Sequence, residues 1–150
     1  MMDLRSRLAL ICYSAAGLAN VVLGLVYVAR TEFMPYHAQA VGSEWAFVPE
    51  GTRALIAALM NVAGAAWIMV GCLILALVWF PFRSETKWAR WTIPAVIVIH
   101  YGTILAVTLQ VQAATGAQTP WLMNAFAVAV GITGLLLDRP WISTAQNGLR

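Results

Sequence analysis

Four long apolar runs alternate with short polar segments along the chain of 150 residues. The runs cover residues 8–29, 54–80, 91–113 and 121–137, and all nine Lys and Arg and all six Asp and Glu lie between or outside them. A helix rises about 1.5 Å per residue, so the first three runs exceed the length needed to cross a hydrocarbon core of about 30 Å, and the fourth is marginal. The pattern predicts an all-α fold, a four-helix transmembrane bundle.

Composition supports a membrane location. The chain is 61% hydrophobic and only 10% charged, which is more apolar surface than a water-soluble domain of this size can bury. Arg5 and Arg7 before the first run imitate a secretory signal, but the run is too long for the apolar region of one and is kept as a span. No linker separates two domains, so residues 1–150 are expected to form a single integral membrane domain.

The basic residues predict the orientation of the chain. Only Arg30 and Arg53 lie on one side of the predicted bundle. The other seven lie on the opposite side: Arg5, Arg7, Arg83, Lys87, Arg90, Arg139 and Arg150. The positive-inside rule therefore places the N- and C-termini in the cytoplasm. The net charge of +3 is explained by this topology, and no nucleic-acid partner is expected.

The outer loop between spans one and two, residues 30–53, is rich in aromatic and apolar side chains. Pro35 is a favourable helix start and Gly42 a favourable helix end, while Ser43 is a possible cap for another turn. Pro49 with Glu50 opens span two. We expect the loop to be short and helical, acting as a lid or as an interfacial helix.

Polar residues recur on one face of each span. Asn20 lies between Gly17 and Gly24, and Asn61 is followed at helical spacing by Gly64, so the two asparagine-bearing stripes are expected to face each other. A direct Asn20–Asn61 hydrogen bond is plausible. Span three contributes His100, Thr103 and Gln110 and span four contributes Asn124, which completes a polar seam weighted toward the outer half.

His100 is the only strongly polar titratable residue within a run. It is either a functional group, as a ligand contact, proton relay or metal ligand, or a neutral imidazole hydrogen-bonded to a neighbouring helix. The candidate ligand-binding residues are His100, Asn20, Asn61, Thr103, Gln110, Asn124, His37 and Glu32.

Glu32 and His37 in the outer loop have side chains able to bind a metal or a proton, but their spacing matches no known ligand motif. An acidic, aromatic loop at a membrane surface explains them equally well. No residue is assigned as a catalytic group or metal ligand, and no cofactor is identified.

The segment Arg30-Thr-Glu-Phe-Met-Pro-Tyr-His, together with Pro81-Phe-Arg and Trp88-Ala-Arg, resembles a group of small, uncharacterised bacterial four-span membrane proteins. This resemblance implies a multi-pass protein of a bacterial inner membrane. The size and four-span plan are more loosely similar to DoxX-like proteins, with no shared motif.

Three functions remain open. The first is binding of a small hydrophobic or amphipathic ligand, such as a lipid, quinone or isoprenoid, in an outward-facing intramembrane pocket. The second is an accessory or structural subunit of a larger membrane complex, with a membrane-protein partner or a homo-oligomer. The third is an intramembrane enzyme using His100, which requires a second titratable group within reach of its imidazole.

Overall fold

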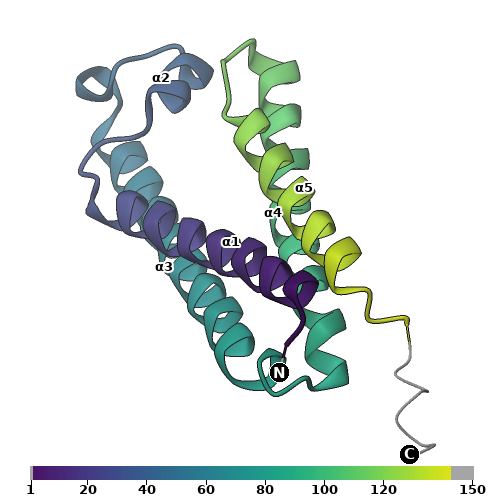
Figure 1. Ribbon diagram of the computed structural model, residues 1–150. Coiled ribbons are helices and arrows are strands. Elements are labelled where there is room, and N and C mark those ends of the chain that lie inside the picture. Colours follow the sequence, from purple (N-terminus) through teal and green to yellow (C-terminus); the bar gives the residue numbers. More distant parts are fainter. Residues whose placement is uncertain (1, 143–150) are drawn as a thin grey trace, which may run out of the picture.

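The computed structural model describes residues 2–142, and within them all regular structure is helical (Figure 1). The elements in chain order are α1 (Leu4–Ala29), α2 (Pro35–Val41), the 3₁₀ turn η1 (Trp45–Phe47), α3 (Glu50–Leu77), the π-helical turn η2 (Val78–Phe82), α4 (Lys87–Thr115) and α5 (Trp121–Asp138). Helices α1, α3 with η2, α4 and α5 are long and apolar enough to span a membrane. The predicted all-α, four-span fold is confirmed. Arg150, counted in the topology prediction, lies outside the described residues.

Local sequence explains where the helices begin and end. Asp3 caps α1, because its Oδ1 accepts a hydrogen bond from the Ser6 backbone N–H at 2.8 Å. Helix α2 begins at Pro35 as predicted and ends at Gly42, whose φ of 69° favours glycine. Glu44 and not the predicted Ser43 occupies the N-cap position of the next turn, without a side-chain cap hydrogen bond, because the Ser43 N–H bonds to Ala38 O at the end of α2.

Two glycine pairs bring α1 and α3 into close contact. Gly17 lies against Gly71, and Gly24 lies against Gly64, in an antiparallel arrangement. A Cβ atom added at Gly24 would lie 2.6 Å from Gly64 O, so only glycine allows this approach. Small residues at such contacts let membrane helices gain packing that lipid cannot replace. The predicted glycine stripes therefore form the interface between these helices.

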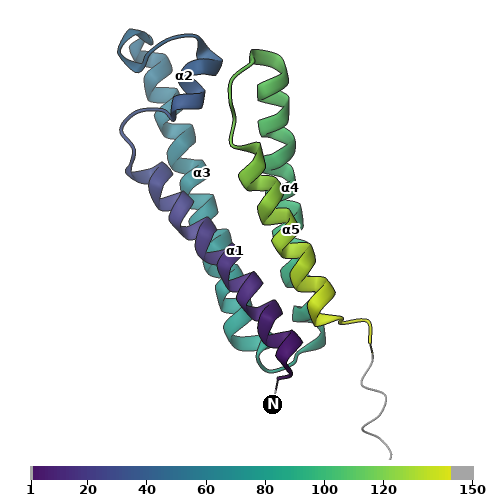
Figure 2. The same ribbon diagram turned by 45° about the horizontal axis from the view of Figure 1, so that its top comes forward.

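Helices α4 and α5 form the second pair (Figures 1 and 2). Gly131 of α5 accommodates Ile97 of α4, and Gly134 accommodates the Tyr13 ring of α1. The α5–α1 contact joins the two pairs near the start of α1, whereas α3 and α4 touch only slightly. Toward α2 the pairs diverge, as Figure 2 shows. We call the end with the start of α1, η2 and the end of α5 the basic end, and the end with α2, η1 and residues 116–120 the loop end.

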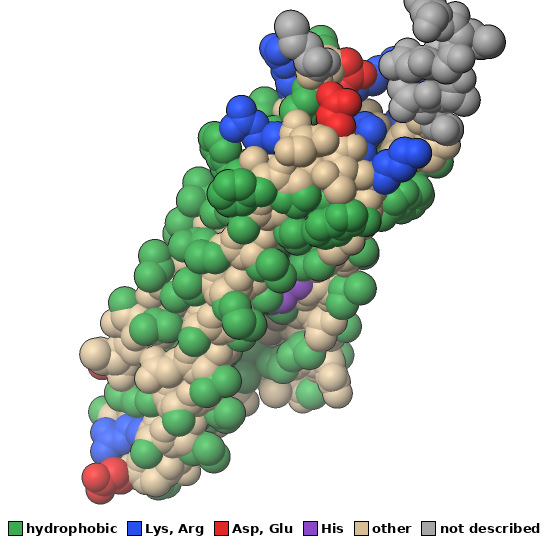
Figure 3. All heavy atoms as spheres, turned by 90° about the horizontal axis from the view of Figure 1, so that it is seen from below, with side chains coloured by type: hydrophobic (Ala, Val, Ile, Leu, Met, Phe, Trp, Pro, Cys, Tyr) green, Lys and Arg blue, Asp and Glu red, His purple; other side chains and the backbone are tan. Residues whose placement is uncertain are grey.

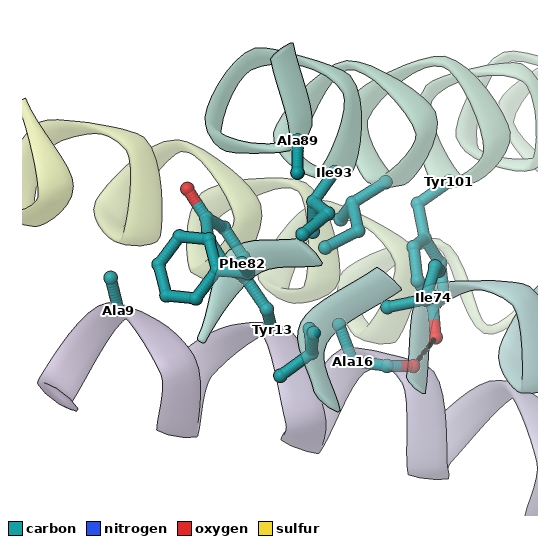
Figure 4. Packing of buried hydrophobic residues seen from close by; sticks show 10 residues of the cluster. Ala9, Tyr13, Ala16, Ile74, Phe82, Ala89, Ile93 and Tyr101 are labelled. Atoms are coloured by element: carbon teal, nitrogen blue, oxygen red, sulfur yellow. Dashed lines mark hydrogen bonds between the residues drawn. The ribbon is translucent and has the colours of Figure 1, made fainter. Parts of the chain in front are cut away.

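The basic half of the bundle is filled by a packed core (Figure 4). Tyr13 packs edge-on against Phe82 of η2 with ring centroids 5.6 Å apart, and Tyr101 Oη donates a hydrogen bond to Ala16 O at 3.0 Å. Ile93 and Ile97 of α4 are fully buried beside them. This core anchors the two helix pairs to each other at one end only.

The outside of the bundle is apolar, and charged groups gather at its two ends (Figure 3). Large side chains such as Leu59, Val62 and Ile99 are 60–69% exposed. Exposed apolar surface over the whole middle of a molecule is expected for contact with lipid tails. The chain is a multi-pass membrane protein.

Candidate functional site

A cavity of about 430 Å³ lies in the loop half, where the two helix pairs diverge. It has walls from α1, α3, α4 and α5, and α2 covers it. The lining residues are Leu23, Tyr27, Met34, Tyr36, His37, Ala63, Trp67, Thr103, Ile104, Val107, Thr108, Val111, Thr119, Pro120, Met123 and Asn124. A cavity of this size with apolar walls and a few polar groups has the form of a small-molecule site.

The polar groups on the α4–α5 side form a connected network. Thr119 Oγ1 donates to Thr108 O at 3.0 Å, and Asn124 Nδ2 donates to Thr108 Oγ1 at 3.5 Å and to Pro120 O at 3.3 Å. All three side chains are at least nine-tenths buried. Because Pro120 O can only accept, the Asn124 amide is oriented with its NH₂ group toward that carbonyl, which leaves Oδ1 unpaired.

The cover of the cavity is held by two polar contacts. Tyr27 Oη of α1 and Tyr36 Oη of α2 share a hydrogen bond. At the far side, Gln39 Oε1 accepts from the Gln118 backbone N–H at 2.9 Å, which joins α2 to the α4–α5 loop. Helix α2 therefore bridges the open end of the two pairs and closes the cavity from the loop end, as a lid.

His37 lies on the cavity side of this lid. Its Nδ1 accepts from the Met34 backbone N–H at 3.4 Å, and its ring lies edge-on to that of Tyr36, with centroids 4.2 Å apart. Burial lowers the pKa of the His37 imidazole, because the charged form loses hydration there. The neutral ring with Nδ1 as acceptor carries its proton on Nε2, so Nε2 is a donor.

Aromatic packing supports the lid from beneath. Tyr27 lies against Trp67 of α3 with centroids 4.6 Å apart, and Phe33 packs edge-on against Trp45 at 4.9 Å. Phe33 and Met60 are 5% exposed and belong to the same apolar cluster. The aromatic residues of the loop between α1 and α3 thus fold onto the ends of these two helices.

His100 forms a hydrogen bond with Asn20 across the α1–α4 contact, with Nε2 donating to Oδ1 at 3.0 Å. Its ring also lines an open groove between α3 and α4, which shares Thr103 and Ile104 with the cavity. Asn20 is fully buried, and its Nδ2 has no partner among the described residues. His100 therefore lies one helical turn below the cavity and does not line it.

The predicted site residues separate into three groups. His37, Thr103 and Asn124 line the cavity. Asn20 and His100 bond to each other below it. Glu32, Asn61 and Gln110 are exposed and do not line it.

The predicted Asn20–Asn61 hydrogen bond is wrong. The buried face of α3 runs through Met60, Gly64 and Gly71, and Asn61 lies one residue to the side of Met60, on the exposed surface. Asn20 pairs with His100 instead because the glycine contacts bring α3 backbone, and not an α3 amide side chain, against α1.

Sequence reasoning missed Thr108, Thr119 and Tyr36 as lining residues. Thr108 is only five residues from Thr103, and helical periodicity puts it at a different angle on α4. Only the packing of α5 against α4 shows that Thr108 lines the cavity. Tyr36 could have been found from the loop, where an aromatic residue follows directly on a helix-starting proline.

A charged cluster at the basic end was also missed. Arg90 Nε donates to Asp138 Oδ2 at 2.8 Å, and Arg90 Nη2 donates to Asp138 Oδ1 at 2.7 Å. Ser6 Oγ donates to Oδ1 at 3.3 Å, so α1, α4 and α5 are joined. The Asp138 side chain is fully buried, and the Arg90 side chain is 25% exposed. In the sequence, Arg90 and Asp138 are only charged residues just beyond the end of a predicted span, and nothing indicates that they pair.

The His100 imidazole has an amide as its side-chain partner, and no titratable group among the described residues hydrogen-bonds to it. Within residues 2–142, no group of three His, Cys, Asp or Glu side chains comes close enough together to hold a metal ion. The cavity and the residues around it therefore provide hydrogen-bonding groups and apolar contact surface.

Comparison with protein-family models, curated proteins and solved structures gave no match.

Proposed function

We propose that this membrane protein binds a small hydrophobic or amphipathic molecule in the cavity beneath α2. The observation that carries the proposal is the cavity itself: two helix pairs packed together at the basic end are held apart at the loop end, and the space between them is covered by a lid. A bundle with only a structural role gains stability by closing such a space, because empty volume forfeits packing energy.

The lining supports an apolar ligand with a small polar part. Trp67, Leu23, Val107, Val111 and other side chains provide apolar contact along most of the wall. Asn124 and His37 each present a polar atom without a protein partner. This combination is typical of sites in which apolar burial provides affinity and a few polar groups orient the ligand.

A native purification tests the proposal. The protein would be extracted gently from its own membrane, and native mass spectrometry with lipid and metabolite identification would detect what remains bound. The variant Ala63→Phe places a ring in the cavity, and Ala66→Phe places the same ring on the exposed face of the same helix.

We expect one molecule bound to the wild type and to Ala66→Phe and absent from Ala63→Phe. The same molecule at the same occupancy in Ala63→Phe would refute the proposal. A stoichiometric partner protein with no bound small molecule would instead favour an accessory subunit.

We further propose that the loop end faces outward and that the basic end faces the cytoplasm of a bacterial inner membrane. The excess of basic residues at one end supports the orientation, and the resemblance of the loop sequence to bacterial four-span proteins supports the location.

After replacement of Cys12 and Cys72, a single cysteine would be introduced by Ser43→Cys at the loop end or by Ser84→Cys at the basic end. A membrane-impermeant maleimide should label the first in intact spheroplasts and the second only after lysis. The reverse pattern would invert the proposed topology.

A further inference from the structure

The cavity is lined without any charged side chain. Among its sixteen lining residues there is no Asp, Glu, Lys or Arg. The charged residues of the outer loop do not line it either: Arg30, Glu32, Glu44, Glu50 and Arg53. The Arg90–Asp138 pair lies at the opposite end of the bundle. A ligand in the cavity would therefore meet no counter-ion.

This lining discriminates against charged headgroups. A carboxylate or phosphate that leaves water needs a cation or several donors, and burying it unpaired is far more costly than burying an uncharged polar group. No Lys or Arg side chain lines the cavity. The Gln118 backbone N–H is occupied by Gln39, and Asn124 Nδ2 is occupied by Thr108 and Pro120.

Donors and an acceptor remain open to a ligand. His37 Nε2 is a donor, because Nδ1 already accepts from Met34 N–H. Asn124 Oδ1 is an acceptor with no donor among the described residues, although Asn124 is only 7% exposed. The fully enclosed side-chain polar atoms without a partner, among residues 2–142, are Tyr13 Oη and Asn20 Nδ2. Asn124 Oδ1 is not one of them, so it is not fully enclosed by protein, and Asn124 lines the cavity.

A cavity with open donors and an open acceptor suits a hydroxyl group, which can accept from a donor and donate to the acceptor. A carbonyl oxygen would leave Asn124 Oδ1 unpaired, and a hydrocarbon would leave both unpaired. Unpaired buried polar groups weaken binding, so the site favours the ligand that satisfies both.

We propose that the ligand is an uncharged lipid whose polar end is a hydroxyl group, of the chemical class of long-chain or isoprenoid alcohols. Its hydroxyl lies toward His37 and Asn124 at the loop end, and its chain extends between the helix pairs past Trp67 and Ile104 toward the groove beside His100. This inference rests on the proposed function of the cavity and adds the class of ligand.

Photolabelling tests the class of ligand directly. Three probes of equal chain length, an alcohol, a carboxylic acid and a plain hydrocarbon, each carry the same mid-chain diazirine. The protein is reconstituted in nanodiscs at a pH well above the carboxyl pKa, and labelled residues are mapped by peptide mass spectrometry. We expect the cavity residues to be labelled about tenfold more by the alcohol than by the carboxylate. Ala63→Phe should remove this labelling, and Ala66→Phe should retain it.

The outcomes separate the two proposals. Equal or stronger cavity labelling by the carboxylate, blocked by Ala63→Phe, would overturn the ligand class and leave the cavity as a binding site. Labelling confined to lipid-facing residues, unchanged by Ala63→Phe, would overturn both.

The variant Asn124→Leu tests the hydroxyl contact. It removes the acceptor and keeps an apolar side chain of similar size, so labelling by the alcohol should fall about fivefold to tenfold while labelling by the hydrocarbon persists. Persistence of the hydrocarbon signal also shows that the cavity is intact. An unchanged ratio of alcohol to hydrocarbon labelling would contradict the contact.

Discussion

Gly24→Ala tests the contact that sets the spacing of α1 and α3. The added Cβ would lie 2.6 Å from Gly64 O and 2.8 Å from Ile68 N, whereas ordinary van der Waals contact begins at 3.4 Å. Both blocking atoms are backbone, so no change of rotamer relieves the overlap. The two helices must separate locally by about 0.8 Å, which disturbs a packed interface at a cost of about 1–3 kcal/mol.

Gly102→Ala is the matched control. Gly102 also lies within a long spanning helix, α4, but a Cβ there meets nothing within 4 Å. Both substitutions gain the same helix propensity, about 1 kcal/mol. The difference between the two variants therefore isolates the clash, and Gly24→Ala should be less stable than Gly102→Ala by about 1–3 kcal/mol.

The assay is reversible unfolding by SDS in mixed micelles, followed by far-UV circular dichroism, with the free energy of unfolding obtained for each variant. Gly64→Ala should behave like Gly24→Ala, because its Cβ would lie 2.8 Å from Gly24 O. The double variant should be less destabilised than the sum, since one separation of the helices relieves both clashes. Equal stability of Gly24→Ala and Gly102→Ala would refute the reasoning.

Three further predictions concern the ends of the bundle. Arg90→Met should lower the free energy of unfolding by about 3–5 kcal/mol in the same assay, because it leaves the buried Asp138 carboxylate without its cation. Adding Asp138→Leu should recover most of this loss. Additive destabilisation by the two substitutions would contradict the pairing. Ligand retention should weaken as the pH falls below about 6.5. Burial lowers the pKa of His37 when the lid is closed, so protonation of His37 favours the open lid. Native mass spectrometry over a series of pH values should show this loss of bound ligand in the wild type but not in His37→Gln. Gln39→Ala removes the hydrogen bond that joins α2 to the α4–α5 loop. Hydrogen exchange of the α2 amides should therefore become about fivefold faster, with the global stability unchanged. Unaltered exchange would mean that other contacts hold the lid.

Local signals in the sequence determined the helices. The apolar runs and the charges that flank them predicted all four spans, and each helix extends beyond its run by at most about one turn, because capping and polar side chains can continue a helix past the hydrocarbon core. Pro35 and Gly42 predicted the start and end of α2 correctly, since proline suits the first turn and glycine suits a positive φ.

The site was predicted only in part. Of the predicted residues, Asn124, Thr103 and His37 line the same cavity, because polar residues within or beside a span tend to face the bundle interior. Asn61 was placed inward although it is exposed, because it is the residue next to Met60, a rotation of about 100° on the helix, and it is Met60 that shares the buried face with Gly64 and Gly71. Periodicity alone does not resolve which of two adjacent stripes a neighbouring helix covers.

The sequence by itself determined the number of spans, their approximate ends, the glycine contacts available to α1 and α3, and the short helix α2. Only the tertiary structure decided that α1 pairs with α3 and α4 with α5, that the pairs diverge toward the loop end, and that Thr108, Thr119 and Asn124 converge beside a lid that carries His37. The physical reason is that helix formation and membrane insertion depend on short segments of chain, whereas a cavity depends on where packing between distant segments fails to close.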